Sequence, residues 1–282
     1  MKVRLSALIA AVVAALLIAS GAPAGDEQAT RYYLSLGDSL AAGSGRGGDV
    51  DDYPEQLFDA LRQSDHTLKH VRLGCGGESS TSMRFGSRLP SLVLSCGTPR
   101  YYKNFLFPKG TQLEEAVSFV SAHKGKVALV TIDIGANDLS RIDPQGDVVS
   151  CLFEPQGCDA QVAAMQANLT AILAELQAAA GPAVPIVGMT YYDVFAPLCV
   201  PPASLAFVCS RVDAVNAVLA DTYATAGVPV ADVAGAFEND DLSSAADNVC
   251  AWTRFCTSGF VDTHPNATGY GLIAQEFLEV IQ

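Results

Sequence analysis

The sequence is poor in basic residues. Its 282 residues include 17 Lys and Arg against 30 Asp and Glu, which gives a formal net charge of −13. A surface of this sign repels nucleic acids and other polyanions, because binding to phosphate depends on clustered Lys and Arg. The composition therefore predicts that nucleic acid is not a partner.

Metal-binding motifs are lacking as well. The eight cysteines contain no C-x-x-C pair, and the four histidines complete no Cys/His quartet with zinc-finger spacing. His66 and His70 form an H-x-x-x-H pair in a polar segment without further ligands, so we interpret them as solvated surface residues. We expect no metal site.

No apolar run reaches the ~20 residues that a membrane-spanning helix needs. The run Leu5–Ala19 falls short of that length; it follows Lys2 and Arg4 and precedes the small residues Ala22-Pro23-Ala24. This pattern is typical of a secretory signal peptide with cleavage near Ala24. We expect residues 1–24 to be the signal and the mature chain to be extracellular with no stable membrane span. Retention of the segment as an anchor stays open.

Linkers, charge blocks and internal repeats are also missing, so residues 25–282 are expected to form a single domain. Short apolar runs alternate with helical patterns along the chain. The expected strands are Tyr32–Leu36, Val127–Ile132, Pro185–Met189 and Val228–Val230, and the expected helices are Tyr53–Arg62, Leu113–His123, Asp159 (as N-cap) to Gly181, Arg211–Ala226 and Ala267–Ile281. Such alternation predicts an α/β fold with a parallel sheet covered on both faces, and with sites at the carboxyl ends of the strands. Residues 145–158 and 197–209 are expected to be long loops.

Eight cysteines in an exported chain suggest four disulfides. Their order along the chain forms four local pairs. The predicted bonds are Cys75–Cys96, Cys151–Cys158, Cys199–Cys209 and Cys250–Cys256.

Polar turns follow several of the apolar runs, and one of them contains a candidate nucleophile, Ser39, in "GDS" at 37–39. A serine reacts only if a base accepts its proton and donors receive the oxyanion. His264 is the candidate base, because Pro265 and the start of the last helix hold its turn. A purely structural role for this histidine stays open. Gly77 and Asn137 lie in two further turns, where a backbone N–H and an amide can form an oxyanion hole.

A rival motif is G-x-G-x-x-G at Gly43, Gly45 and Gly48, which can indicate dinucleotide binding. We disfavour this interpretation because the glycines begin well beyond the end of the strand and no helix follows directly. No G-x-S-x-G elbow is present either, which argues against an α/β-hydrolase.

Four motifs in order, "GDSL" at 37–40, "GCGGESS" at 74–80, "GAND" at 135–138 and "DTHPNATGY" at 262–270, resemble those of secreted bacterial SGNH, or GDSL-type, hydrolases. The resemblance covers nearly all of the mature chain. It implies a flavodoxin-like three-layer α/β/α fold and ester hydrolysis without a cofactor. It also implies Ser39 as nucleophile, His264 as base, and the Ser39 N–H, Gly77 N–H and Asn137 amide as oxyanion donors.

The chain departs from the family in its acid. The usual Asp-x-x-His spacing is shortened, so Asp262 stands two residues before His264 and Val261 occupies the third position. Either the Asp262 carboxylate or the Val261 carbonyl can accept the His264 Nδ1–H. We favour Asp262 because a charged acceptor stabilises an imidazolium more than a neutral one does.

The substrate class follows less directly. Phe105–Pro108 and Leu198–Phe207 can supply apolar surface for an acyl chain, which favours lipid-like or simple carboxylic esters. A carbohydrate acetyl esterase, or a non-catalytic module that binds envelope lipids or glycans, stays open as an alternative. The sequence leaves the oligomeric state open.

Overall fold

The computed structural model describes residues 29–43, 52–86, 110–142, 148–201, 205–259 and 262–281. The predicted signal segment lies outside these ranges, as do Gly45, Gly48 and the apolar segment at 105–108. None of the helices within the described ranges combines the length and the hydrophobicity needed to cross a membrane.

A five-stranded sheet forms the centre of the fold. Its strands are β1 (Arg31–Gly37), β2 (Leu68–Arg72), β3 (Val127–Asp133), β6 (Ile186–Met189) and β7 (Val230–Ala231). They lie in the order β2-β1-β3-β6-β7, and every neighbouring pair is parallel. Counted along the chain this is the order 2-1-3-4-5 of flavodoxin-like folds. The α/β fold with a parallel sheet is therefore confirmed.

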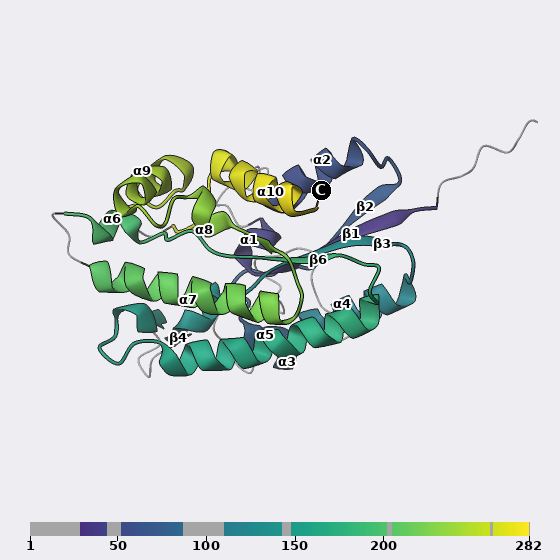
Figure 1. Cartoon of the computed structure of the whole chain (residues 1–282), viewed down its shortest axis with the longest axis horizontal. Coiled ribbons are helices and arrows are strands. Elements are labelled where there is room, and N and C mark those ends of the chain that lie inside the picture. The colour runs from purple at the N-terminus through teal and green to yellow at the C-terminus, as the bar shows by residue number, and fades with distance from the viewer. Residues whose placement is uncertain are drawn as a thin grey trace, which may run out of the picture.

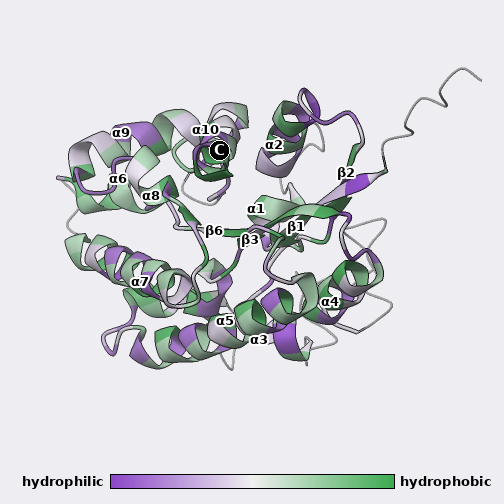
Figure 2. Cartoon of the chain, turned by 45° about the vertical axis from the view of Figure 1, so that its right-hand side comes forward, coloured by the Kyte–Doolittle hydropathy of each residue, from purple (hydrophilic) through white to green (hydrophobic). Residues whose placement is uncertain are grey.

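The central strands are apolar because both of their faces are covered. Residues 33–37 of β1 and 129–133 of β3 are all buried, which is the pattern of a parallel sheet between two helical layers. Figure 2 shows these strands as mostly hydrophobic in the interior of the chain. By contrast, β2 is an edge strand with polar residues, which explains why its apolar signal in the sequence is weak.

Helices cover the sheet on both sides (Figure 1). One layer contains α2 (Tyr53–Arg62), α6 (Ala196–Cys199), α8 (Val233–Ala236), α9 (Leu242–Trp252) and α10 (Ala267–Ile281). The opposite layer contains α3 (Ser80–Phe85), α4 (Gln112–Ala122), α5 (Asp159–Ala180) and α7 (Ala206–Thr225). The three layers agree with the predicted α/β/α architecture.

Three helix starts differ from the prediction. Helix α4 spans Gln112–Ala122, so it begins and ends one residue earlier than predicted. Helix α5 begins with Asp159 itself, and its N-cap is Cys158 rather than Asp159. Helix α7 begins at Ala206 rather than at Arg211, because Val208 and Cys209 are buried and extend its apolar face by more than a turn.

The two segments expected to be long loops contain regular structure. Within 145–158, β5 (Val148–Ser150) pairs antiparallel with β4 (Ser140–Ile142), and the short helix η2 (Cys151–Phe153) follows. Within 197–209, the chain forms the end of α6 and the first turn of α7. Both segments are short elements packed at the edge of the core.

The structure contains three of the predicted disulfides, Cys151–Cys158, Cys199–Cys209 and Cys250–Cys256. Cys75 is also disulfide-bonded, while Cys96 lies outside the described residues.

The prediction of a solvated pair at His66 and His70 is half wrong. His66 is exposed, but only 6% of the His70 side chain is accessible. The His70 ring stacks on Tyr33 at a centroid distance of 4.6 Å, and its Nε2 lies 2.9 Å from Ser35 Oγ. Burial in this aromatic contact lowers the pKa of His70 to about 3, so the ring is neutral. His70 is part of the core.

We predict that peptide mapping under non-reducing conditions joins Cys75 to Cys96. The reason is that the other bonds already use the six remaining cysteines in local pairs. Alkylation of the intact protein before digestion serves as the control for free thiols. A peptide that links Cys75 to any other cysteine would contradict the prediction.

Candidate active site

The candidate site lies where the carboxyl ends of β1 and β3 meet. Ser39 follows β1 by two residues, and Asn137 lies in the short helix η1 (Ala136–Leu139) after β3. In the order 2-1-3-4-5, β2 is added on one side of β1, and β3 and the later strands are added on the other side. Open α/β sheets bind ligands at the carboxyl ends of the two strands between which the strand order reverses in this way.

Ser39 is the first residue of the short helix α1 (Ser39–Ala42), whose start is held by two buried carboxyls. Asp38 Oδ1 accepts a hydrogen bond from the Leu40 N–H at 2.9 Å, and Asp133 Oδ2 accepts one from the Ala41 N–H at 3.2 Å. Tyr53 donates its hydroxyl to Asp133 Oδ1 at 2.9 Å. Burial and the neighbouring Asp38 carboxyl raise the pKa of Asp133 well above its usual range, and burial also raises the pKa of Asp38.

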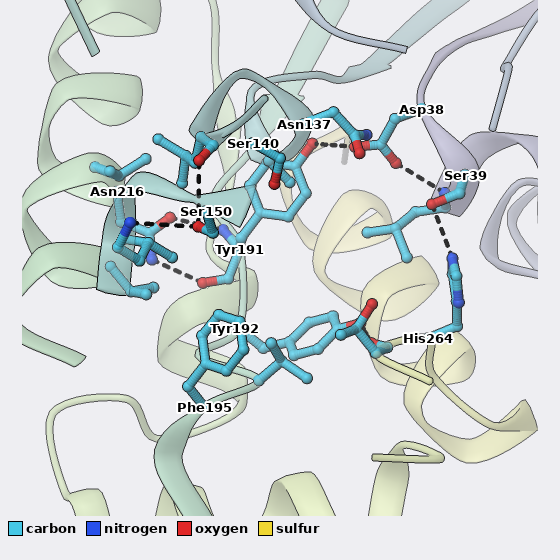
Figure 3. A pocket seen from close by; sticks show the side chains of 18 residues that line it. Asp38, Ser39, Asn137, Ser140, Ser150, Tyr191, Tyr192, Phe195, Asn216 and His264 are labelled. Atoms are coloured by element: carbon cyan, nitrogen blue, oxygen red, sulfur yellow. Dashed lines mark hydrogen bonds between the residues drawn. The ribbon is translucent and has the colours of Figure 1, made fainter. Parts of the chain in front are cut away.

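Ser39, His264 and Asp262 form a hydrogen-bonded chain. His264 Nε2 lies 2.9 Å from Ser39 Oγ, and His264 Nδ1 lies 2.7 Å from Asp262 Oδ1 (Figure 3 shows the Ser39–His264 contact). The structure therefore brings together the three residues that the sequence singles out as nucleophile, base and acid. The alternative acceptor, the carbonyl of Val261, lies outside the described residues.

The turn that carries His264 is pinned to the end of α9. The Arg254 N–H donates to the His264 carbonyl at 2.9 Å, and the Asn266 N–H donates to the Trp252 carbonyl at 2.9 Å. The disulfide Cys250–Cys256 closes the loop that contains both partners. These bonds fix the backbone on either side of Pro265, so the histidine is held in place by the fold.

Asp262 is held in its charged form. Partial burial by itself raises its pKa, but the hydrogen bonds from the His264 side chain and backbone, with the charges of His264 and Arg254, outweigh burial and hold the pKa of Asp262 below its usual range. Arg254 Nη1 lies 3.8 Å from Asp262 Oδ2. A charged Asp262 can stabilise an imidazolium at His264.

Two of the predicted oxyanion donors, Asn137 and Gly77, differ in whether they line the pocket that contains Ser39. Asn137 lines the same pocket as Ser39 and His264, whereas Gly77 is absent from its walls. The turn that contains Gly77 is held on both sides, since the Cys75 N–H donates to the Gly37 carbonyl at 3.0 Å and Asn137 Nδ2 donates to the Glu78 carbonyl at 3.0 Å. Within the described part of the chain, the N–H groups of Ser39 and Gly77 donate to no protein acceptor.

A buried side-chain network supports this turn. Gln112 accepts from the Gly37 N–H at 2.7 Å and donates to both the Gly37 carbonyl, at 3.0 Å, and Glu78 Oε2, at 3.2 Å. Ser82 donates its hydroxyl to Glu78 Oε1. Burial raises the pKa of Glu78 to about 7, against the hydrogen bonds from Ser82 and Gln112. Gln112 and Glu78 thus link the backbone before Ser39 to the Gly77 turn.

Ser39 and His264 open onto a pocket of about 220 Å³ (Figure 3). Its further wall comes from η1, β4, β5, η2, α7 and the segment after β6, and it is mostly apolar. The apolar side chains are Leu40, Leu139, Leu152, Val194, Phe195, Val212 and Val215. The described residues of the segment 198–207, which the sequence suggested as acyl-binding surface, are not among those that line the pocket.

Sequence reasoning missed several residues that hold the site. Gln112 lies in no motif that the sequence argument used, and Glu78 lies inside "GCGGESS" at 74–80 but was given no role there. Tyr191 and Tyr192 lie just after the end of β6 at Met189. This position after a strand is the signal in the sequence that could have indicated a role at the site. Asp38 lies within "GDSL", but the motif assigned it no role of its own.

Potential metal ligands cluster at one place in the described part of the chain. Within the described ranges, the potential ligands that cluster are Asp193, Cys199 and Cys209. The two sulfurs form a disulfide and therefore offer no thiolate.

The three-layer fold, with a serine, a histidine and a carboxylate at its switch point, is that of a GDSL-type hydrolase. A model of the GDSL-like Lipase/Acylhydrolase family matches residues 35–272, and the chain belongs to this family. No protein of curated function matches the sequence.

Solved structures share the fold at low sequence identity. They include a phospholipase A1 from Streptomyces albidoflavus NA297 (17% identity, 89% of this chain and 100% of that chain, TM-score 0.50) and an extracellular lipase from Streptomyces rimosus (20%, 89% and 100%, TM-score 0.50). An acetyl xylan esterase matches at 12% identity, over 89% of this chain and 100% of that chain, with a TM-score of 0.50. At such identities the likeness describes the fold alone.

We predict that Glu78→Gln makes the stability less dependent on pH. The pKa of Glu78 rises from 4.5 to about 7 on folding, so the native state binds more protons than the unfolded state between these values. Its contribution is therefore present at pH 4.5 and is lost as the pH rises towards 7, by at most about 3 kcal/mol. The fall in Tm from pH 5 to pH 8 should be shallower in the variant, and the exposed Glu175→Gln serves as control. An equal slope in the wild type and Glu78→Gln would contradict the assignment.

Proposed function

We propose that the protein is a serine hydrolase that cleaves carboxylic esters through an acyl-enzyme. The observation that carries the proposal is the continuous chain from Ser39 Oγ through His264 to Asp262, with contacts of 2.9 and 2.7 Å, at the mouth of an apolar pocket. This arrangement matches the requirements for an activated nucleophile, a base within hydrogen-bond reach and a third group that orients the base.

In the first half-reaction Ser39 Oγ attacks the ester carbonyl carbon while His264 Nε2 accepts its proton. The carbonyl oxygen becomes an oxyanion, which the N–H groups of Ser39 and Gly77 and the amide of Asn137 stabilise. As the tetrahedral intermediate collapses, the bond to the alcohol breaks and His264 gives its proton to the leaving oxygen.

In the second half-reaction water takes the place of the alcohol. His264 accepts a proton from the water, whose oxygen attacks the acyl carbon, and the Ser39 oxygen leaves as His264 returns the proton. Asp262 stays ionised in both steps and stabilises the imidazolium. The products are the carboxylic acid and the free enzyme.

The pocket favours the acyl part of a lipid-like or simple ester over a sugar. Its far wall is built mainly from Leu, Val and Phe side chains, which offer dispersion contacts but few hydrogen bonds to a sugar ring. A volume of about 220 Å³ suits a short acyl group better than a long one. A carbohydrate acetyl esterase remains the second candidate, supported by the likeness to an acetyl xylan esterase and by the small volume.

Export of the chain is part of the proposal. Three disulfides support an oxidising compartment, and one structure of similar fold is named an extracellular lipase. The expected signal at residues 1–24 supports the same destination.

We predict that the purified protein hydrolyses p-nitrophenyl esters, and that Ser39→Ala abolishes this activity while the surface control Ser64→Ala retains it. Activity should survive EDTA, because the proposed mechanism uses protein groups alone. A series of esters from acetate to palmitate, measured beside acetylated xylan, should show a maximum at short or medium chains. Full turnover by Ser39→Ala, or its loss in EDTA, would overturn the assignment. Turnover of no ester would favour a non-catalytic binding module.

We predict that Asp262→Asn lowers kcat by roughly 10²- to 10⁴-fold, because the amide cannot stabilise the imidazolium and favours the wrong tautomer of His264. Asp247→Asn, an exposed change on α9, serves as the matched control. Circular dichroism should show both variants folded. A loss under threefold in Asp262→Asn would make the site a Ser–His pair oriented by the backbone.

A further inference from the structure

Two adjacent tyrosines after β6 reach the two halves of the candidate site. The Tyr191 hydroxyl donates to Asp38 Oδ2 at 3.0 Å, and the Tyr192 hydroxyl donates to the Thr263 carbonyl at 2.6 Å. Asp38 immediately precedes Ser39, and Thr263 immediately precedes His264. Each hydroxyl is therefore bonded to the residue next to one of the two reacting side chains.

Two asparagine side chains hold the backbone of the segment that contains the tyrosines. Asn216 of α7 accepts from the Tyr191 N–H at 2.8 Å and donates to the Tyr191 carbonyl at 2.7 Å. Asn239 donates to the same carbonyl at 3.2 Å and accepts from the Asp193 N–H at 3.0 Å. Figure 3 shows Asn216 beside Tyr191, whose ring extends toward Asp38. Two buried amides thus fix one short segment, although no regular element continues β6 there.

The rings of Tyr191 and Tyr192 are constrained by burial as well. Tyr191 is 9% exposed and Tyr192 is 7% exposed, and the Tyr192 ring stacks on Phe237 at a centroid distance of 4.6 Å. Burial and nearby ionisable groups raise the pKa of both tyrosines well above the usual range, so both hydroxyls remain protonated donors. With backbone and rings held, the two hydroxyls occupy fixed positions relative to each other.

We propose that Tyr191 and Tyr192 are positioning residues that set the distance between Ser39 and His264, acting as a rigid bridge from the nucleophile turn to the histidine turn. This inference rests on the proposed function. Ser39 and His264 come from distant parts of the sequence, and their 2.9 Å contact depends on how two separate turns are placed. A bridge made of consecutive residues joins these turns through one peptide unit and two aromatic rings.

The bridge matters for rate more than for substrate binding. A displacement of reacting groups by about 1 Å can cost on the order of 10²-fold in rate, even when the mutated residue lies outside the chemistry. Both tyrosines line the pocket, but a change to Phe keeps the ring and removes only the hydroxyl, which is bonded to the Asp38 carboxylate or to the Thr263 carbonyl. Loss of a hydroxyl should therefore lower kcat and leave KM nearly unchanged.

The test compares Tyr191→Phe and Tyr192→Phe with the matched control Tyr223→Phe. Tyr223 is fully buried, and its hydroxyl bonds a backbone carbonyl of β3, that of Ile132 at 3.5 Å, rather than a residue of either turn. Kinetics on a short p-nitrophenyl ester are normalised to active sites titrated with a fluorophosphonate, so that misfolded molecules do not count. Ser39→Ala is measured in the same panel.

We expect Tyr191→Phe and Tyr192→Phe each to lower kcat by roughly 10- to 100-fold with KM within about twofold, while Tyr223→Phe stays near wild type. The far-downfield proton NMR signal of the His264 Nδ1–H should shift or broaden in Tyr192→Phe and persist in Tyr223→Phe.

Two results would overturn the inference: kcat within twofold of wild type in both bridge variants, or an equal loss of kcat in Tyr223→Phe. If these occur while Ser39→Ala is inactive, the bridge is wrong and the proposed function stands. Activity in Ser39→Ala would overturn the proposed function instead.

Discussion

The contact between Ser39 and His264 joins residues that are 225 positions apart, and the candidate site depends on it. No local propensity can create such a contact. It exists because β1 and β3 run parallel, so that their carboxyl ends open on one edge of the sheet, and because the turn before α10 is fastened beside that edge. The sheet sets the approximate positions of the turns that carry Ser39 and His264, and hydrogen bonds between turns fix their final positions.

Several acids around this contact are buried or half-buried. Asp38, Glu78, Asp133 and Asp138 all lie near the carboxyl ends of the strands, and burial raises the pKa of each. Each carboxyl accepts hydrogen bonds from backbone or hydroxyl donors, so the acids hold turns in place. Asp262 differs, because His264 and Arg254 keep its pKa low. The pKa of Asp262 is thus lowered, whereas the pKa values of these four neighbouring acids are raised by burial.

Much of the fold could be predicted from the sequence, because buried parallel strands and amphipathic helices leave strong patterns. The bounds of α2 and α10 agree with the prediction, and β1, β3 and β6 differ by a residue or so. The small elements β4, β5, η2 and α6 were missed, because stretches of three or four residues carry too little periodicity. The 11-residue helix α9 was missed as well. His70 was misplaced because its burial depends on Tyr33, a contact between neighbouring strands that no local pattern encodes.

The residues of the candidate site likewise fall into those that the sequence could predict and those that it could not. Ser39, His264, Asp262 and Asn137 could be proposed because each lies in a short motif after a strand or before a helix. The residues that hold them carry weaker signals in the sequence, since Gln112, Tyr191 and Tyr192 act through contacts across the sheet edge. A motif names the groups that react, whereas the groups that position them are dispersed over helices and strand ends.

The three described disulfides each close a loop of only 6 to 10 residues. Loops this short contribute about 2–3 kcal/mol each in the chain-entropy model. Cys199–Cys209 joins the end of α6, in one helical layer, to the first turns of α7, in the other. Each bond therefore constrains one short stretch of the chain, and none of the three joins the turn of Ser39 to the turn of His264. The placement of these two turns relative to each other rests on the sheet and on hydrogen bonds, so reduction of the described disulfides would loosen single segments without releasing one turn from the other.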